Sequence, residues 1–184
     1  MNIFYLDSDP QKCAEMHVDK HCVKMILEYA QLLSTAHRFL DGVPKLERSE
    51  TTGRKRTSYI LSDDRNDLFY RATHINHPSA VWVRKSNSNY VWLANLLLHL
   101  CKEYTYRYGK THKVESSGLL EQLYWNIPKT IPKGFTHDFT EPTPAMPDQY
   151  KVAGDSIQSY KNYYLGDKTR MFSWKNRQTP TWVS

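Results

Sequence analysis

Residues 9–40 read DPQKCAEMHVDKHCVKMILEYAQLLSTAHRFL, a stretch without glycine and with proline only at its second position. Asp9 is suited to cap the start of a helix, and Pro10 fits its first turn. Gly42 and Pro44 follow the stretch and provide a stop. The stretch therefore predicts one long N-terminal helix around which the rest of the chain folds.

A narrow polar stripe runs along this predicted helix, and most of its remaining surface is apolar. With about 100° per residue, the stripe consists of His17, Lys20, His21, Lys24, Glu28 and Gln31. A surface helix usually has a broad polar face, so this pattern indicates a helix that is largely enclosed. The stripe then either lines a polar cleft or forms a narrow strip that is open to water.

The other segments add helices and few strands. Asn2–Leu6 is short and apolar, which suits a strand or an extended anchor. Asn89–Tyr108 has a helical apolar period, with Ser86 or Ser88 as cap and Gly109 as stop. We therefore predict a mainly α protein. It is a single compact helical domain over the whole chain, residues 1–184, with a short N-terminal extended segment before the long helix.

The residues after the long helix are polar and basic. Residues 42–58 mix Gly, Ser, Thr and charged side chains without a period, which predicts a mobile basic loop. The run Arg54-Lys55-Arg56 is typical of a solvated surface. Alternatively, it is an arm that contacts phosphates.

The composition sets limits on the class of protein. The formal net charge of +6 permits a polyanionic partner such as nucleic acid. The three cysteines form no CxxC pair, which favours buried thiols in a reducing compartment. No apolar run reaches 18 residues and no signal peptide is evident, so we expect a cytoplasmic protein with no membrane partner.

His17 and His21 have the spacing that places two imidazoles on one metal ion. However, the sequence HVDKH is not the HExxH motif, because Val18 replaces the glutamate that acts as general base. Lys20 and Lys24 flank the pair, and cations beside a divalent metal are unfavourable. The sequence therefore predicts no metal site and no cofactor, with a metal-dependent hydrolase kept as an alternative.

The stripe also suits acid–base or nucleophilic chemistry without a metal. His17 and His21 would transfer protons or bind phosphate. Lys24 would be a nucleophile or an electrostatic stabiliser, and Glu28 would orient it. In the plainer alternative, Lys24 and Glu28 form an ordinary ion pair and the histidines line a polar seam.

Basic residues interleaved with aromatic ones predict where a substrate binds. Cations can hold phosphates while aromatic rings stack on bases. The predicted substrate-binding residues are Lys20, His77, Arg84, Tyr106, Arg107, Lys110 and Lys113. Two polar residues on the apolar side of the long helix need partners. We expect Asp19 to pair with an arginine such as Arg84, and His37 to bond a backbone carbonyl.

Four blocks carry a resemblance to a widespread, uncharacterised family of small phage-type proteins. They are HVDKHCVKMILEYAQLLSTAHR (17–38), HPSAVWVRKSNSNYVWL (77–93), CKEYTYRYGKTHK (101–113) and AMPDQYK (145–151). The resemblance covers nearly the whole chain. It implies a phage-encoded protein that acts in the cytoplasm of the host cell.

More distantly, the layout resembles the pyrimidine-dimer DNA glycosylases. The shared features are a short N-terminal segment, a first helix with an early histidine, a central aromatic helix and the Pro180-Thr181-Trp182 sequence. The resemblance implies a mainly helical fold and attack on a sugar carbon by the N-terminal amine, assisted by a glutamate on the first helix. The position nearest that glutamate holds Lys24 or Val23. Asn2 is large enough that Met1 is expected to be retained.

Together these observations predict an enzyme that acts on a base or sugar of DNA or a nucleotide, glycosylase-like or base-modifying. The reactive residues would be the His/Lys/Glu stripe on the first helix. The alternatives are a non-enzymatic phage factor that binds nucleic acid or a host protein, and the metal-dependent hydrolase. DNA or a nucleotide is thus the predicted partner.

Overall fold

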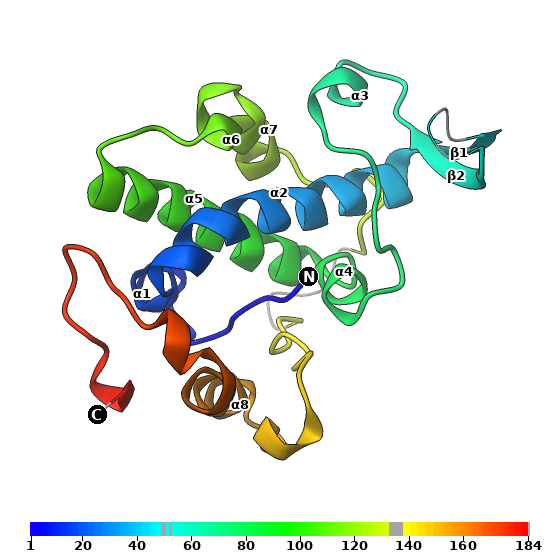
Figure 1. The fold of residues 1–184 in the computed structure, drawn as a ribbon. Helices are drawn as coiled ribbons and strands as arrows, with labels where there is room; N and C mark the ends of the chain where they lie inside the picture. The colour runs from blue at the N-terminus through cyan, green and yellow to red at the C-terminus, as the bar shows by residue number, and fades with distance from the viewer. Residues whose placement is uncertain (49–50, 52, 133–137, 184) are drawn as a thin grey trace.

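Two long helices, α2 (Asp19–Asp41) and α5 (Asn87–Tyr108), pack against each other at the centre of the molecule (Figure 1). The structure is a computed structural model that describes residues 1–48, 51, 53–132 and 138–183. Within those residues the regular β-structure is a single two-stranded hairpin. The fold is therefore mainly α, as the sequence predicts.

Short elements surround the central pair. They are α1 (Pro10–Met16), β1 (Val43–Arg48), β2 (Lys55–Ile60), α3 (Arg65–Leu68), α4 (Pro78–Val83), α6 (Lys113–Ser116), α7 (Leu119–Trp125), η1 (Asp148–Tyr150), α8 (Ser156–Tyr163), the π-helical turn η2 (Tyr164–Lys168), η3 (Thr169–Met171) and η4 (Thr181–Val183). Helix α5 begins after the side-chain cap of Ser86 and ends at Gly109, which has a φ of +63°. Both boundaries follow the sequence signals.

The predicted helix over residues 9–40 is interrupted near its start, so that part of the prediction is wrong. His17 and Val18 have extended backbone and separate α1 from α2. Arg107 of α5 donates to the carbonyl oxygens of Glu15 and His17 at 2.9 and 2.8 Å. These bonds satisfy carbonyl groups that the interruption leaves without helical partners.

The segment before α1 is buried and extended, as predicted. Phe4 donates its backbone N–H to the hydroxyl of Tyr29 on α2 at 3.2 Å. Tyr5 packs edge-on against Trp92 of α5, with ring centroids 5.0 Å apart. The segment thus contacts both central helices and belongs to the hydrophobic core.

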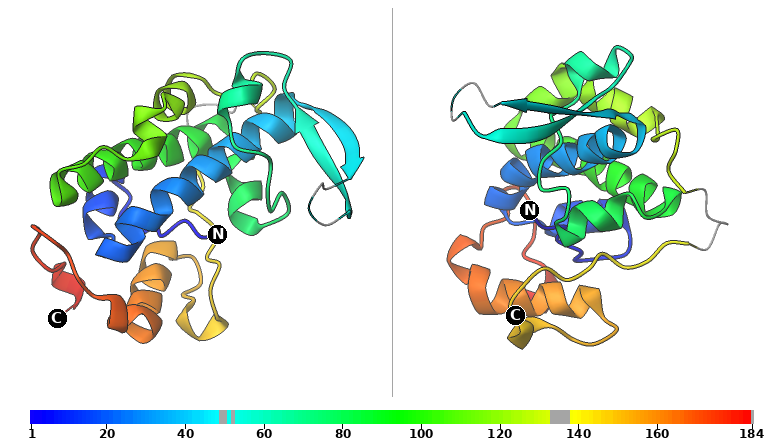
Figure 2. Two further views of the ribbon diagram at one scale, coloured as in Figure 1. Left: turned by 45° about the horizontal axis from the view of Figure 1, so that its top comes forward. Right: turned by 90° about the vertical axis from the view of Figure 1, so that its right-hand side faces the viewer.

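Residues 43–48 and 55–60 pair as an antiparallel hairpin, so the expectation of an irregular loop is wrong for them. Residues 49, 50 and 52 lie outside the described part of the chain. The ion pair between Glu47 and Arg56 joins the strands at 2.8 Å. The hairpin projects from the molecule beyond the end of α2 (Figure 2).

The C-terminal tail docks where α1 meets α2. Trp174 is buried and donates from its indole nitrogen to the carbonyl oxygen of Met16 at 2.9 Å. The cysteines Cys13, Cys22 and Cys101 are buried and free. In the described part of the chain, no helix has both the length and the apolar character needed to cross a membrane.

Candidate functional site

His17 is a hydrogen-bonding residue of the core. Its side chain is fully buried, with Nδ1 2.7 Å from the carbonyl oxygen of Cys13 and Nε2 2.8 Å from the hydroxyl of Tyr29. Because a carbonyl oxygen only accepts, Nδ1 carries the proton and Nε2 accepts from the tyrosine. Burial lowers the pKa of His17 to about 4. Both ring nitrogens are occupied, so the predicted catalytic role of His17 is wrong.

His21 is also buried, but its ring lies nearer the surface, at 7% exposure. The ring stacks on Phe4 with centroids 4.1 Å apart, and Nδ1 lies 2.7 Å from the hydroxyl of Tyr164. Burial, together with neighbouring positive groups, lowers the pKa of His21 to about 3. The imidazole is therefore neutral at pH 7. The expectation of one continuous stripe fails here, because the interruption after α1 places both histidines inside.

Lys24 and Glu28 form the predicted i,i+4 ion pair on the outer face of α2, with Nζ and Oε1 3.0 Å apart. The lysine side chain is 68% exposed and the carboxylate only 14%. The carboxylate orients the exposed ammonium group and neutralises part of its charge. Lys20, one turn earlier, is exposed as well. This geometry favours electrostatic stabilisation over nucleophilic attack for Lys24.

His77 caps α4, a helix that packs against α2 although it is far away in the sequence. Its Nδ1 accepts from the backbone N–H of Ser79 at 3.2 Å and caps α4, so Nε2 carries the proton of the neutral ring. Burial lowers the pKa of His77, as do the Met1 α-amine and His74, whereas Glu28 raises it. Helix α4 packs against α2, and Figure 1 shows the N-terminus beside α4.

We call Lys24, Glu28, His77 and the Met1 α-amine the Glu28 cluster. It combines a carboxylate, a neutral imidazole with an available N–H, and amino groups. His74 stands at its edge with a φ of +50°, a backbone conformation that is uncommon for residues other than glycine. Such strained positions concentrate at functional sites.

Residues from the C-terminal third of the chain also pack against His21. Tyr164 begins the π-helical turn η2, and π-helical turns are frequent at functional sites. Lys168 ends this turn, with Nζ 4.3 Å from the ring centroid of Tyr163 and 2.6 Å from Asp167. Sequence reasoning missed these residues, since Tyr164 lies 143 positions from His21. The aromatic and charged run YYLGDK was the only local signal.

Two predicted substrate-binding arginines have structural roles, so those predictions are wrong. Arg107 is buried and pairs with Glu103 at 2.7 Å and with Asp19 at 2.9 Å. It is therefore the arginine partner of Asp19, in place of Arg84. Arg84 donates to the carbonyl oxygen of Ile75 at 2.6 Å, and its guanidinium lies over the Phe39 ring.

The remaining predicted binding residues lie at the end of α5. Tyr106, Lys110 and Lys113 are exposed, and the hydroxyl of Tyr106 donates to the carbonyl oxygen of Asn176 at 2.9 Å. This end of α5 meets α2 at Asp19. Glu28 is nine residues, or about 13 Å, further along the helix. The structure thus pairs Lys24 with Glu28 and packs the helix of His77 against α2. Tyr106, Lys110 and Lys113 lie apart from that site.

His37 is buried and bonds side chains, and a backbone hydrogen bond at Asn126 raises its pKa, in keeping with the expected carbonyl partner. Its Nε2 lies 2.8 Å from the hydroxyl of Tyr90, and its Nδ1 lies 2.9 Å from Nη1 of Arg65. A guanidinium only donates, so Nδ1 accepts. Burial and the charge of Arg65 lower the pKa of His37 to about 4.

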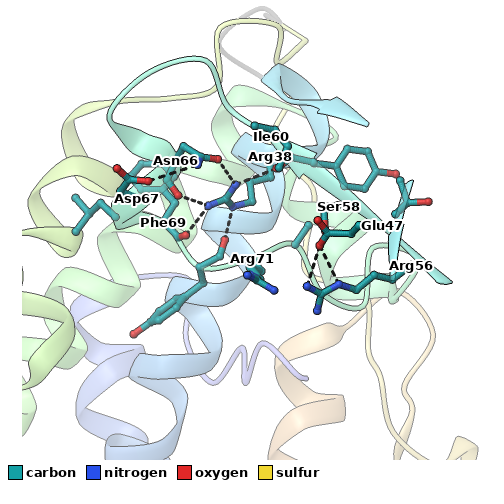
Figure 3. Close-up of a pocket in the computed structure, with 14 residues that line it drawn as sticks. Arg38, Glu47, Arg56, Ser58, Ile60, Asn66, Asp67, Phe69 and Arg71 are labelled. Carbon is teal, nitrogen blue, oxygen red and sulfur yellow. Dashed lines mark hydrogen bonds and ion pairs between the residues drawn. The ribbon is translucent and has the colours of Figure 1, made fainter. Parts of the chain in front are cut away.

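A separate cavity of about 670 Å³ lies between the hairpin and residues 66–72 (Figure 3). Arg38 forms part of its wall and donates five hydrogen bonds, to the carbonyl oxygens of Tyr59, Asn66, Phe69 and Tyr70 and to the side chain of Asn66. Arg38 is therefore fully engaged. Arg56 and Arg71 also line the cavity.

The described residues contain no group of three or more His, Cys, Asp or Glu side chains arranged to hold a metal ion. Comparisons of the chain with protein-family models, with curated proteins and with solved structures found no match. A proposal for the function therefore rests on the geometry of the Glu28 cluster.

Proposed function

We propose that the protein is an enzyme that acts on a base or sugar of DNA or a nucleotide, with the Glu28 cluster as its reactive centre. The observation that carries the proposal is the packing of α4, which His77 caps, against α2, which carries the Glu28 carboxylate and an exposed ammonium group. A carboxylate and a neutral imidazole at one surface are the groups that proton transfer requires.

A glycosylase-like reaction makes use of each of these groups. Breaking the bond between base and sugar leaves positive charge on the sugar carbon, which the Glu28 carboxylate would stabilise. The leaving base carries negative charge, which the Nε2–H of His77 can stabilise by donating a hydrogen bond, and water then supplies the proton. Lys24 and Lys20 would hold the phosphates that flank the sugar.

Amine attack is the variant that the resemblance to the pyrimidine-dimer glycosylases suggests. An unprotonated amine, from Lys24 or from Met1, would form a bond to the sugar carbon as the bond to the base breaks. The base would leave as an anion that accepts a hydrogen bond from His77 and takes its proton from water, and Glu28 would remove a proton from the attacking nitrogen. The sugar ring would then open as its C–O bond breaks, with the ring oxygen taking the proton from Glu28, and an imine would form. Water would hydrolyse the imine and return the free amine.

The experiment measures base release by mass spectrometry from DNA that contains normal, damaged or modified pyrimidines, and from free nucleotides. Glu28→Gln should lower the rate at least 100-fold, as expected for loss of an acid–base group. Glu121→Gln, an exposed carboxylate on α7, is the matched control and should keep full activity. Equal rates for both variants would remove the Glu28 cluster as the reactive centre.

A second experiment separates the two chemistries. Borohydride reduces an imine to a stable bond, so amine attack should give a covalent adduct between protein and DNA. The adduct should disappear, together with base release, in the variant that lacks the attacking amine. Base release without an adduct would favour direct hydrolysis. DNA binding without any reaction would favour the alternative of a non-enzymatic binder.

A further inference from the structure

The β1–β2 hairpin concentrates positive charge at one end of the molecule (Figure 2). Residues 43–60 contain five lysines and arginines and two glutamates, a net +3 of the formal +6 of the whole chain. The cations are Lys45, Arg48, Arg54, Lys55 and Arg56. Half of the net charge thus lies in about a tenth of the chain.

The register of the hairpin leaves much of this charge without compensation. Arg48 lies directly opposite Lys55, and like charges in this position destabilise a strand pair. On the other face Arg56 is neutralised by Glu47. Within the described part of the chain Lys55 has no ion pair. The Arg48–Lys55 pair is therefore unfavourable in water and becomes favourable beside an anion.

The hairpin also exposes apolar side chains. Val43 is 68% exposed and Leu46 is 67% exposed. A two-stranded hairpin is only marginally stable by itself, so an exposed ribbon with these side chains is poorly explained as a structural element. Apolar side chains on a DNA-binding ribbon can contact the methyl groups of thymine.

A further cation extends the charged surface into the cavity beneath the hairpin. Arg71 lines this cavity, is exposed, and forms no ion pair or hydrogen bond with other described residues. Figure 3 shows Arg71 between the Arg38 hydrogen bonds and the Arg56–Glu47 pair. A DNA strand that runs along the hairpin would therefore also meet the positive charge of Arg71 at the base of the hairpin.

We propose that the β1–β2 hairpin binds duplex DNA as a two-stranded ribbon in the major groove, with Arg48, Lys55 and Arg71 on the phosphates. The major groove of DNA is wide enough for such a ribbon, whereas that of duplex RNA is too narrow for side chains to read. The inference deepens the proposed function and rests on it in one respect, because it makes polymeric DNA the substrate of the Glu28 cluster.

The test measures binding of a fluorescent DNA duplex by anisotropy over a series of salt concentrations. The variant Arg48→Gln/Lys55→Gln removes two phosphate contacts. Its plot of log affinity against log salt should flatten by about 2. The control Lys12→Gln/Lys102→Gln removes two exposed cations elsewhere and should keep the wild-type slope. Thermal melting of the hairpin variant should be no lower than wild type, because a like-charge pair is removed.

An unchanged slope in the hairpin variant, or equal flattening in the control, would overturn the inference. Tighter binding of single-stranded DNA or duplex RNA than of duplex DNA would do the same. The variant Glu28→Gln distinguishes this failure from failure of the proposed function. If Glu28→Gln abolishes base release while the hairpin variant keeps its slope, only the hairpin inference fails. If the slope flattens but Glu28→Gln has no effect on base release, only the proposed function fails.

Discussion

Arg107 donates from Nη1 to the carbonyl oxygen of His17 at 2.8 Å, across the point where α1 ends and α2 begins. The same guanidinium holds the carbonyl oxygen of Glu15 and the carboxylates of Asp19 and Glu103. One buried side chain thus fixes the direction in which α2 enters the core. The positions of Lys24 and Glu28 depend on that direction.

Replacing Arg107 should therefore affect stability. In Arg107→Met the Glu103 carboxylate, 3% exposed, keeps only Arg177 as an ionic partner. Breaking a buried pair from one side costs about 3 kcal/mol. Urea unfolding measures this loss, and Lys110→Met on the exposed turn should stay within about 0.5 kcal/mol of wild type. A stable Arg107→Met that fails only in DNA binding would restore the substrate-binding role predicted from the sequence.

His21 and Lys24 should respond differently to truncation although they are less than one turn apart. His21→Ala removes the ring stacked on Phe4 and leaves the Tyr164 hydroxyl without this partner, so it should cost about 2 to 3 kcal/mol. Lys24→Ala removes an exposed ion pair and should cost less than about 1 kcal/mol. Chemical denaturation of the two variants in parallel tests this difference. Equal stabilities would contradict the buried position of His21.

The buried histidines predict that the protein loses stability in acid. Burial lowers the pKa of His17 and His37 to about 4 and of His21 to about 3. The unfolded chain takes up these protons near pH 6.5, while the folded chain does not. Their stabilisation is therefore complete above pH 6.5 and is lost as the pH falls toward about 4. At pH 5 each histidine should account for roughly 2 kcal/mol of the loss relative to pH 7.5.

Urea unfolding between pH 7.5 and pH 5 checks this slope. His37→Gln removes one of the three most deeply buried histidines, so the number of protons taken up on unfolding should fall by about one. Substitution of His112, which caps α6 and is only half-buried, is a control with a smaller effect. A wild-type stability that does not change over this pH range would contradict the neutral, buried state of the histidines.

Zinc should not stabilise the folded protein through the HVDKH sequence. Both nitrogens of His17 are engaged inside the core, so the pair cannot offer two open imidazoles to one ion. A ligand that binds only the folded state raises the melting temperature. Differential scanning fluorimetry with and without zinc should therefore give the same midpoint. A rise that disappears in His17→Gln would show that the core opens to accept the metal.

Local signals were sufficient to predict the long elements of the fold. Helix α5 begins at the Ser86 cap and ends at Gly109, as the sequence indicates. The interruption at His17 and Val18 could not be predicted, because neither residue breaks a helix. Its stabilising contact comes from Arg107, 90 residues later. The sequence did not predict the hairpin, because its charged residues obscure the alternation of polar and apolar side chains that is typical of strands.

The candidate site, like the fold, could be predicted from the sequence only in part. The Lys24–Glu28 pair follows directly from helical spacing, and the structure contains it. Nothing in the sequence connects His77 with Glu28, and only the fold packs the helix that His77 caps against α2. Tyr164 and Lys168 could not be assigned to the site, because a contact across more than a hundred residues has no local pattern.

The position of Phe4 has a consequence for the synthesis of the protein. Its ring stacks on His21 and meets Tyr164 edge-on, with centroid distances of 4.1 and 5.4 Å, so Phe4 packs against a residue that is translated 160 positions later. Ribosomes add about 5 to 20 residues per second, so Phe4 and His21 wait on the order of 10 s for Tyr164. Over that time the apolar start of the chain is exposed to other proteins in the cell. Until Tyr164 is made, the ring of Phe4 therefore lacks one of the aromatic side chains that cover it in the folded protein.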